Sequence, residues 1–473
     1  MEKRPLRSAT SRRRFLHSAI LFGGSVFLAA CSQTPAASPT AAPSAAPTTA
    51  AATAPKVVPA ATVSIKAVSG GKLNVWFSAN WNTVTDQAVG DNFTAWGKQN
   101  GVEVEWQSIP GTPQILEKES ASIAAGAPPE LDNNNSIYWY SQGERADLTD
   151  LVNRVKDKGG GMPPVALAGN TAAGGKIFGA PYAIDPWSAH WRKDVIEPVT
   201  GGGFFKTWED LLALGPKIQQ PPKTYAYAMA TGHEGDHVNN IVTLLWAYGG
   251  RLATEEGVPD IKNPANKAGI DMAVKLWQAK LIPPDSANAT TTSWNNEAYQ
   301  KSRGMIAINP ATIYGWLVVN DKELAGKTGL SIPPKGSAGA FAEGGAPAFG
   351  IFKKSKLADK AFAALEFFMQ PENVQKISSS VEGRYVPIFR DHLNTPFWQS
   401  SAFADLKSIA EVGRIREWPA SPQPWISDVT DAKYVLSDML QQKIIGQGMS
   451  IEQAQDWAQT QMMDSYNKLT KKP

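Results

Sequence analysis

From residue 72 onward, strand-like and helix-like patterns follow one another along the chain, and this alternation restricts the possible folds more than any other feature. Residues 73–77 and 102–106 show the alternating pattern of half-buried strands. Between them, Val89, Phe93 and Trp96 recur at the spacing of one helix face. A strand, a helix and a second strand in this order predict a parallel βαβ unit, so we expect an α/β fold.

The same alternation continues through the rest of the chain. Helix starts are expected at Thr112 and at Thr207, where the sequence shows a capping-box pattern. Residues 305–308 predict a buried strand, and residues 361–369 predict an apolar helix that a proline stops. No internal repeat of fixed period is visible, which disfavours solenoids and propellers.

The first 30 residues predict an export signal peptide. A basic leader precedes an apolar run at residues 19–30, which is too short to span a bilayer as a mature helix. Arg12 and Arg13, followed by Phe15, resemble the twin-arginine export motif, which implies export in the folded state. Leu-Ala-Ala-Cys, ending at Cys31, resembles the lipobox of bacterial lipoproteins and implies acylation of that cysteine. A transmembrane helix is the alternative that the short run disfavours.

Residues 31–70 predict a lipid-anchored, disordered tether. They consist almost wholly of Ala, Pro, Thr and Ser, so they offer too little apolar surface to offset the entropy lost on folding. A coil of this length reaches about 35 Å. Cys31 is the only cysteine of the chain, which excludes an internal disulfide or a Cys-x-x-Cys metal site. We therefore expect the folded body to be held at the outer face of the cell membrane.

Charge and motif content disfavour several function classes. The leader carries six basic residues and one acidic residue, so the formal net charge of +3 falls to about −2 without it; nucleic acid is therefore not an expected partner. No nucleotide-binding loop, zinc-protease motif or nucleophile elbow is visible, and we predict no catalytic residues and no cofactor. His233 and His237 lie four residues apart, but two neighbouring glycines favour a polar loop over a metal site.

Sixteen tryptophans lie in the body of the chain, several of them beside loop-forming residues. Sugar sites combine an aromatic platform with Asp, Glu, Asn and Arg side chains that bond the hydroxyls, so tryptophan in a loop suggests a ligand as readily as packing. The strand or helix spacing of five of them favours packing: Trp76, Trp96, Trp106, Trp208 and Trp277. Turn-like surroundings leave both interpretations open for Trp81, Trp139, Trp187, Trp246, Trp294, Trp418 and Trp425.

A family resemblance extends over most of residues 72–470, and its main segments, in order, are residues 71–76, 123–131, 175–182, 191–194, 206–211, 248–250 and 295–300. These segments resemble the extracellular solute-binding proteins, family 1, of ABC importers, a group that includes maltodextrin- and multiple-sugar-binding lipoproteins. It implies a two-lobed periplasmic-binding-protein fold, with hinge strands and a ligand site between the lobes. The first lobe would hold residues 72–185 and 310–385, and the second residues 186–309 and 386–473.

The resemblance also implies a function. The chain would be a monomeric, non-enzymatic lipoprotein that captures a mono- or oligosaccharide and delivers it to a membrane permease once the lobes close. The implied ligand contacts are Trp81, Asn82, Asp132, Asn133, Trp139, Asp185, Trp187, His233, Asp236, Trp294, Asn309, Gly345, Tyr385 and Trp425. Asp185 would accept two sugar hydroxyls and Trp187 would stack on the ring. The grouping of Asn and Trp favours a neutral ligand.

Two alternatives remain open at this point. The first is a carbohydrate-active enzyme displayed on the cell surface, because the paired carboxylates of a glycosidase leave no local signal in a sequence. The second keeps the same fold but binds another solute, such as a polyol phosphate, which would require clustered Arg or Lys at the site. Catalytic turnover of a sugar would distinguish the enzyme from a binding protein. Binding measured against a panel of ligands would distinguish another solute from a sugar.

Overall fold

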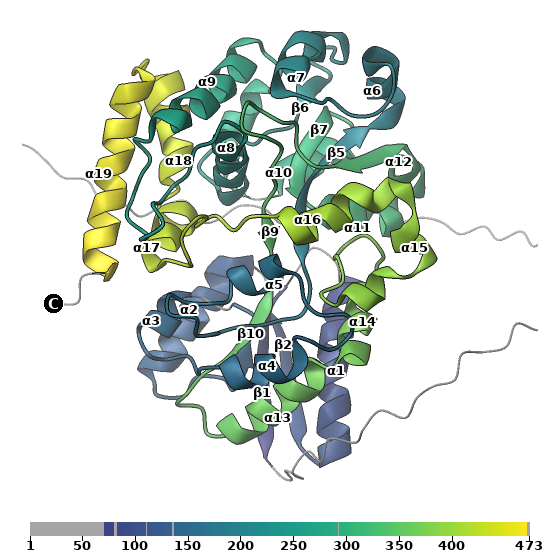
Figure 1. Ribbon diagram of the computed structural model, residues 1–473, viewed down its shortest axis with the longest axis vertical. Helices are drawn as coiled ribbons and strands as arrows, with labels where there is room; N and C mark the ends of the chain where they lie inside the picture. Colours follow the sequence, from purple (N-terminus) through teal and green to yellow (C-terminus); the bar gives the residue numbers. More distant parts are fainter. Residues whose placement is uncertain (1–70, 80–82, 110, 135–136, 292, 471–473) are drawn as a thin grey trace, which may run out of the picture. The chain divides into compact units, whose positions relative to one another are not determined.

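The computed structural model describes residues 71–79, 83–109, 111–134, 137–291 and 293–470 (Figure 1). These residues belong to one compact unit, Ser64–Pro473. The predicted signal peptide, Cys31 and the tether lie outside them. A search of the described helices finds none with the length and apolar character needed to cross a membrane.

Two sheets organise this unit, and each forms the centre of a lobe. The first sheet has the strand order β2-β1-β3-β10-β4 and consists of β1 (Lys72–Ser78), β2 (Glu103–Ile109), β3 (Leu131–Asp132), β4 (Ala180–Pro181) and β10 (Ala348–Ile351). The second has the order β6-β7-β5-β8, with β9 paired to β5, and consists of β5 (Asp185–Arg192), β6 (Tyr225–Tyr227), β7 (Gly304–Pro310), β8 (Thr328–Ser331) and β9 (Gly344–Gly345).

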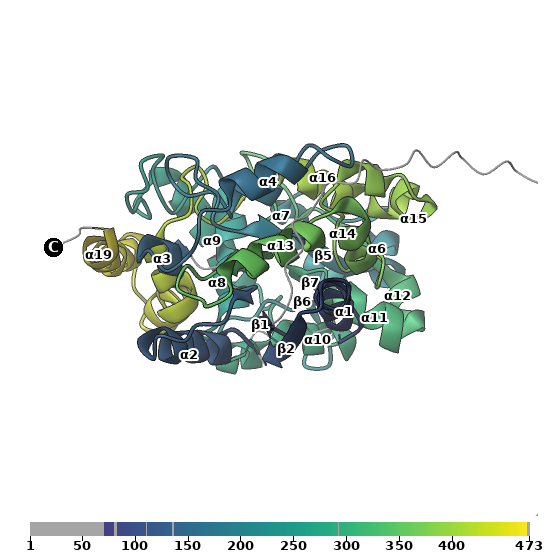
Figure 2. The same ribbon diagram turned by 90° about the horizontal axis from the view of Figure 1, so that it is seen from below.

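The two faces of β1 show how the sequence builds the first lobe. Phe77 is fully buried with Val89 and Phe93 of α1, whereas Trp76 points to the other face and clusters with Ile115 of α2. Figure 2 shows α1 and α2 on either side of β1. Because β1 and β2 pair in parallel, the predicted βαβ unit is confirmed. The helices of this lobe are α1 (Thr83–Asn100), α2 (Gly111–Ala124), α3 (Ile137–Ser141), α4 (Thr149–Val155), α5 (Pro164–Ala168), α13 (Ala358–Phe368) and α14 (Pro371–Ser378).

The second lobe has the larger core, which surrounds α8. The predicted capping box is confirmed, since Asp210 N donates to Thr207 Oγ1 at 2.9 Å and Thr207 N donates to Asp210 Oδ2 at 3.0 Å. The helices up to β8 are α6 (Lys193–Thr200), α7 (Trp208–Leu214), α8 (Gly235–Ala247), α9 (Pro264–Gln278), α10 (Trp294–Gln300), α11 (Thr312–Asn320) and α12 (Lys322–Lys327), with the 3-10 helices Gly215–Lys217 and Pro284–Asn288.

The helices that follow α14 in the chain complete the second lobe. They are α15 (Pro396–Gln399), α16 (Ala404–Val412), α17 (Pro424–Ser427), α18 (Val435–Asp438) and α19 (Ile451–Thr470), with the 3-10 helices Arg390–Leu393 and Ser401–Phe403 and the π-helical segments Asp428–Ala432 and Met439–Gly446. α16 packs against both α5 and β5, so this region contacts elements of both lobes.

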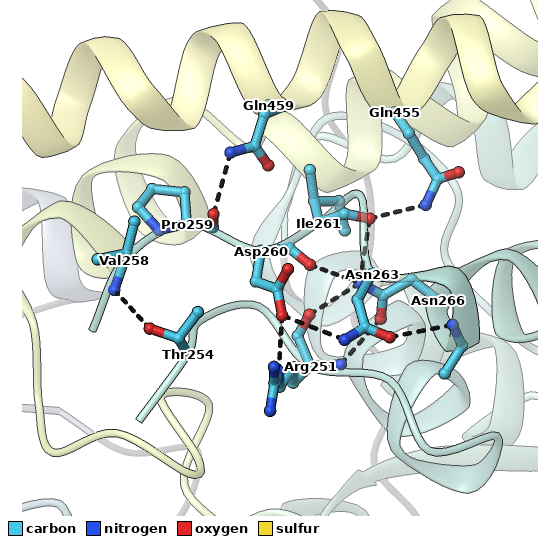
Figure 3. Close-up of polar contacts among 11 residues, drawn as sticks. Arg251, Thr254, Val258, Pro259, Asp260, Ile261, Asn263, Asn266, Gln455 and Gln459 are labelled. Atoms are coloured by element: carbon cyan, nitrogen blue, oxygen red, sulfur yellow. Dashed lines mark hydrogen bonds and ion pairs between the residues drawn. The ribbon is translucent and has the colours of Figure 1, made fainter. Parts of the chain in front are cut away.

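Side-chain hydrogen bonds hold the long helix α19 against the second lobe (Figure 3). Gln455 Nε2 donates to the carbonyl of Ile261 at 2.7 Å, and Gln459 Nε2 donates to the carbonyl of Pro259 at 3.0 Å. The receiving loop is held by Asn266, whose Nδ2 also lies 3.0 Å from the Ile261 carbonyl. The carboxyl-terminal helix is therefore joined to residues about 200 positions earlier in the chain.

The resemblance implies that the chain returns to the first lobe at residue 310, and the structure places this boundary later in the chain. β8 pairs with β5 and α11 packs against β7, so residues 312–331 lie with the second sheet. The chain returns to the first sheet only at β10, which starts at Ala348. The difference arises because Ile313 and Leu317 share a core cluster with Tyr299 of α10, and that long-range packing has no local signal.

Candidate functional site

The carboxyl ends of the parallel strands mark the candidate site. In the second sheet β6 and β7 run parallel, and the carboxyl end of β7 at Pro310 pairs with Trp187 near the start of β5. In the first sheet β1, β2 and β3 are parallel and end at Ser78, Ile109 and Asp132. Ligands of open α/β sheets bind outside the carboxyl ends of strands, so these two edges form the candidate site.

A hinge brings the two edges next to each other. Gly345 pairs with Asp185 at the edge of the second sheet, and Ala348 bridges to Asn134 at the edge of the first sheet three residues later. Two further hydrogen bonds of 3.0 Å join the backbones of Ile184 and Val386. Three separate chain segments therefore pass between the lobes at this place.

A row of buried carboxamides lies along the edge of the second sheet. Asn309, which is 1% exposed, accepts a hydrogen bond from Asn295 Nδ2 at 3.0 Å. Its own Nδ2 donates to Asn296 Oδ1 at 2.5 Å and to Thr312 Oγ1 at 2.8 Å. Because each amide is held by its neighbour, the orientation of the row is fixed.

The start of α8 adds two carboxylates to this row. Glu234 is the N-cap of α8, and its side chain accepts hydrogen bonds from the backbone N–H groups of Asp236 and His237. Asp236 bonds Asn295, which links it to the carboxamide row. Burial raises the pKa of Glu234 to about 7, and burial together with the charge of Glu234 raises the pKa of Asp236.

The same geometry corrects the expectation that residues 231–237 form a loop. The cap made by Glu234 starts the helix at Gly235, so His237 lies in α8 while His233 precedes it. His237 is fully buried and its Nδ1 lies 3.1 Å from the carbonyl of Gly232. His233 is half-exposed, with Nδ1 at 2.9 Å from Asp438 Oδ1. The two imidazoles therefore have different surroundings.

Asp185 forms an ion pair across the hinge. Its carboxylate accepts two hydrogen bonds from Arg384, at 2.6 and 3.2 Å, and the Arg384 side chain is 1% exposed. The guanidinium also stacks on Tyr385, 4.0 Å from the ring centroid. Tyr385 in turn meets the ring of Tyr182 edge to face. The first and third hinge segments are thus joined by charge as well as by backbone bonds.

Glu343 lies on the second hinge segment, directly before β9. Its carbonyl accepts a hydrogen bond of 2.9 Å from Trp187 N, and its Oε1 lies 3.4 Å from Arg416 Nε. Burial raises the pKa of Glu343 to about 7 even though Arg416 is near. Arg416 also pairs with Asp431. One guanidinium is therefore shared between at least two carboxylates.

The edge of the first sheet rests on a buried charged triad. Arg145 Nη2 donates to Asp132 Oδ1 at 2.6 Å and approaches Glu119 Oε1 at 3.3 Å, and all three side chains are fully buried. Glu119 Oε2 accepts from Trp139 Nε1 at 2.9 Å and from Asn134 Nδ2 at 2.8 Å. The triad therefore fixes the segment that follows β3.

The predicted ligand contacts fall into three groups. Asp132, Asn133 and Trp139 gather at the first edge; Asp185, Trp187, Gly345 and Tyr385 lie on the hinge; Asp236, Asn309 and Trp294 lie at or beside the second edge. His233 lies just before α8. Trp81 and Asn82 lie outside the described residues.

Two of the predicted tryptophans are mainly packing residues in this structure. Trp425 is fully buried and its indole N–H donates to the carbonyl of Gly257 at 2.8 Å, so its ring belongs to the core of the second lobe. Trp187 is 7% exposed and also joins that core, although its position at the hinge keeps it beside the candidate site.

Sequence reasoning missed Glu343, Arg416, Asn295 and Tyr434 as candidate site residues. Tyr434 packs edge to face on His233, with ring centroids 4.7 Å apart. The one available signal was the polar run at residues 295–297 before the predicted strand. Glu343 and Arg416 gave no such signal, because the residues that contact them are distant in the sequence and come near only in the folded chain.

The two-lobed α/β fold, with a polar site where the lobes join, is that of a solute-binding protein. A family model described as bacterial extracellular solute-binding protein matches residues 88–404, and the chain belongs to this family. A probable ABC transporter-binding protein of Deinococcus radiodurans is 25% identical over 185 residues, which make up 37% of this chain and 42% of that protein. The match therefore spans less than half of the relative's length.

Solved structures share the fold over most of the chain. A solute-binding protein of an ABC transporter from Thermotoga lettingae, bound with alpha-D-tagatose, has a TM-score of 0.72 at 16% identity. Maltose-bound MalE3 of T. maritima has a TM-score of 0.69 at 18% identity, and a protein from Agrobacterium radiobacter K84 in complex with ribitol has 0.69 at 16%. Each match covers 84% of this chain and 100% of the other. At these identities the likeness concerns the fold.

Proposed function

We propose that this chain is the solute-binding component of an ABC importer, and that it captures a small carbohydrate or polyol between its lobes for delivery to a membrane permease. The family match and the name of the Deinococcus relative support the transport role. The maltose, tagatose and ribitol in the similar structures support this ligand class.

The observation that carries the ligand class is the polar row formed by Asp236, Asn295, Asn309 and Asn296 beside Trp187. Fixed amides and a carboxylate can bond several hydroxyls at once, and an indole edge offers apolar surface to the C–H groups of a sugar. A polyol phosphate is disfavoured, because two guanidinium groups at the hinge already pair with acids: Arg384 with Asp185, and Arg416 with Glu343 and Asp431.

We further propose that the protein is exported and anchored to the outer face of the cell membrane through lipid on Cys31, with residues 31–70 as the tether, and that it acts as a monomer. The leader and the Leu-Ala-Ala-Cys sequence support this. A tethered binding protein stays near its permease, which raises the effective concentration of the loaded form at the membrane.

The ligand class is tested by thermal unfolding of the purified protein against a panel of monosaccharides, disaccharides, amino sugars and polyols. A binder is expected to raise the unfolding temperature in a saturable, concentration-dependent way, because ligand that binds only the folded state stabilises it. Asn309→Leu is expected to abolish the shift, since it removes the residue that joins the amide row. Absence of a saturable shift with every panel member would show that the ligand is not a carbohydrate or polyol.

A further inference from the structure

We propose that the solute bound at this site carries a positively charged amine, as an amino sugar does, and that Asp236 and Glu343 receive its ammonium group. This inference rests on the proposed solute-binding function and narrows its ligand class. It departs from the neutral ligand that the grouping of Asn and Trp in the sequence favours.

The first argument is the excess of acidic over basic side chains around Asp236. Glu234 and Glu343 both act on the Asp236 carboxylate with the same sign, and the opposing charge is that of Arg416. Arg416 is already engaged by other acids, Glu343 and Asp431 among them. Like charges in a buried site destabilise one another, so a cation bound here is favoured over a neutral group.

The second argument is an unused hydrogen-bond acceptor. Glu343 is 9% exposed, and its Oε2 is buried with no hydrogen-bond partner among the residues that the structure describes. Its charge acts on Asp236 and is acted on by that of Asp185, so the carboxylate lies among the groups of the candidate site. A buried acceptor without a donor is costly, and an ammonium group supplies three donors together with the compensating charge.

The third argument is an aromatic ring near Glu234 and Asp431, two acids of the same cluster. Tyr434 has a left-handed backbone, with φ +46, at the start of α18 and next to two π-helical segments. The charges of Asp431 and Glu234 both act on its hydroxyl. Ser437 Oγ donates to the Glu234 carbonyl at 3.1 Å and so ties α18 to the cap of α8. A tyrosine face near carboxylates adds to the attraction for a cation.

Sugar hydroxyls also bond carboxylates, so the experiment must separate charge from hydrogen bonding. Burial raises the pKa of Glu343 to about 7, and the pKa of Asp236 is raised as well. An ammonium next to these groups favours their ionised forms and lowers their pKa, so its binding near pH 6.5 releases protons. A neutral sugar brings no charge, so its hydroxyls lower these pKa values less and release fewer protons.

The test is isothermal titration calorimetry of the purified protein with matched ligands: glucosamine, glucose and N-acetylglucosamine, and the galactose counterparts. Titrations in two buffers of different ionisation enthalpy measure proton release. We expect the better amino sugar to bind at least tenfold more tightly than its neutral partners and to release protons. Asp236→Asn and Glu343→Gln are expected to weaken amino-sugar binding at least tenfold, and by a larger factor than they weaken binding of the neutral parent.

Glu323→Gln is the matched control. It removes the same charge from the exposed face of α12, where Glu323 pairs with Lys327, and it is expected to leave binding unchanged. Neutral sugars that bind as tightly as the amino sugars, or binding of amino sugars without proton release, would overturn the amine proposal and leave the solute-binding proposal standing. If neither set binds and the wider panel gives no thermal shift, both proposals fail.

Discussion

At the scale of single residues, the buried triad of Glu119, Asp132 and Arg145 shows how charge is accommodated beneath the candidate site. Two carboxylates and one guanidinium would leave an uncompensated negative charge in the interior if both acids were ionised. Burial and the nearby Asp132 carboxylate raise the pKa of Glu119 to about 9. A protonated Glu119 makes the triad neutral, and its Oε2 still accepts hydrogen bonds from Trp139 and Asn134.

This protonation predicts how stability depends on pH. The pKa of Glu119 is about 9 in the folded protein and near 4.5 in the unfolded chain, so the folded state binds more protons between these values. The contribution of Glu119 to stability is therefore largest below pH 4.5 and is lost as the pH rises towards 9. Glu119→Gln copies the neutral acid, so the free energy of unfolding of the wild type should fall relative to that of the variant between pH 5 and 9.

Urea unfolding of both proteins across this pH range measures the difference, and Glu323→Gln serves as the exposed control. A difference between wild type and Glu119→Gln that stays constant with pH would contradict the protonated triad.

At the scale of elements, the hinge joins three short segments that lie far apart in the chain. The backbone bonds between Ile184 and Val386 and the pairing of Asp185 with Gly345 bring them together. The ion pair between Asp185 and Arg384 adds a charged link to these bonds. The Arg384 side chain is almost fully buried, and Asp185 compensates its charge.

Asp185→Asn is expected to lower the free energy of unfolding by about 3 kcal/mol, since it leaves a buried guanidinium without its counter-ion. Asp271→Asn breaks an exposed pair with Lys275 on α9 and is expected to cost less than about 1 kcal/mol. Chemical denaturation of the two variants compares them directly. An equal loss in both would show that the hinge pair contributes no more than a surface pair.

At the scale of the whole molecule, the proposed anchor determines where the two-lobed body works. If acyl chains on Cys31 hold the protein, each buried methylene contributes about 0.8 kcal/mol to membrane attachment.

Cys31→Ala is therefore expected to move the protein from the membrane fraction of the cell to the soluble or secreted fraction. Ser32→Ala, one residue further on, is the control and should remain with the membrane. Fractionation followed by immunoblotting measures the distribution. A Cys31→Ala protein that stays in the membrane fraction would contradict the lipid anchor.

The sequence by itself determined the features that depend on neighbours along the chain. The β1–α1–β2 unit and the capping box at Thr207 follow from local spacing, and both are confirmed. The fold class and the family followed from segments in a characteristic order, and both are confirmed by the comparisons. The predicted apolar helix also ends before Pro371, which itself begins α14, because proline fits the first turn of a helix.

Only the tertiary structure decided which polar groups meet. Asn309 joins Asn295 from 14 positions away, and Arg384 joins Asp185 from 199 positions away. Glu343 pairs with Arg416, and its charge acts on Asp236, although nothing near Glu343 in the sequence marks it. Trp425 has the turn-like surroundings of a ligand contact but is buried in a core. Burial and partnership depend on contacts between distant segments, and a linear pattern does not contain them.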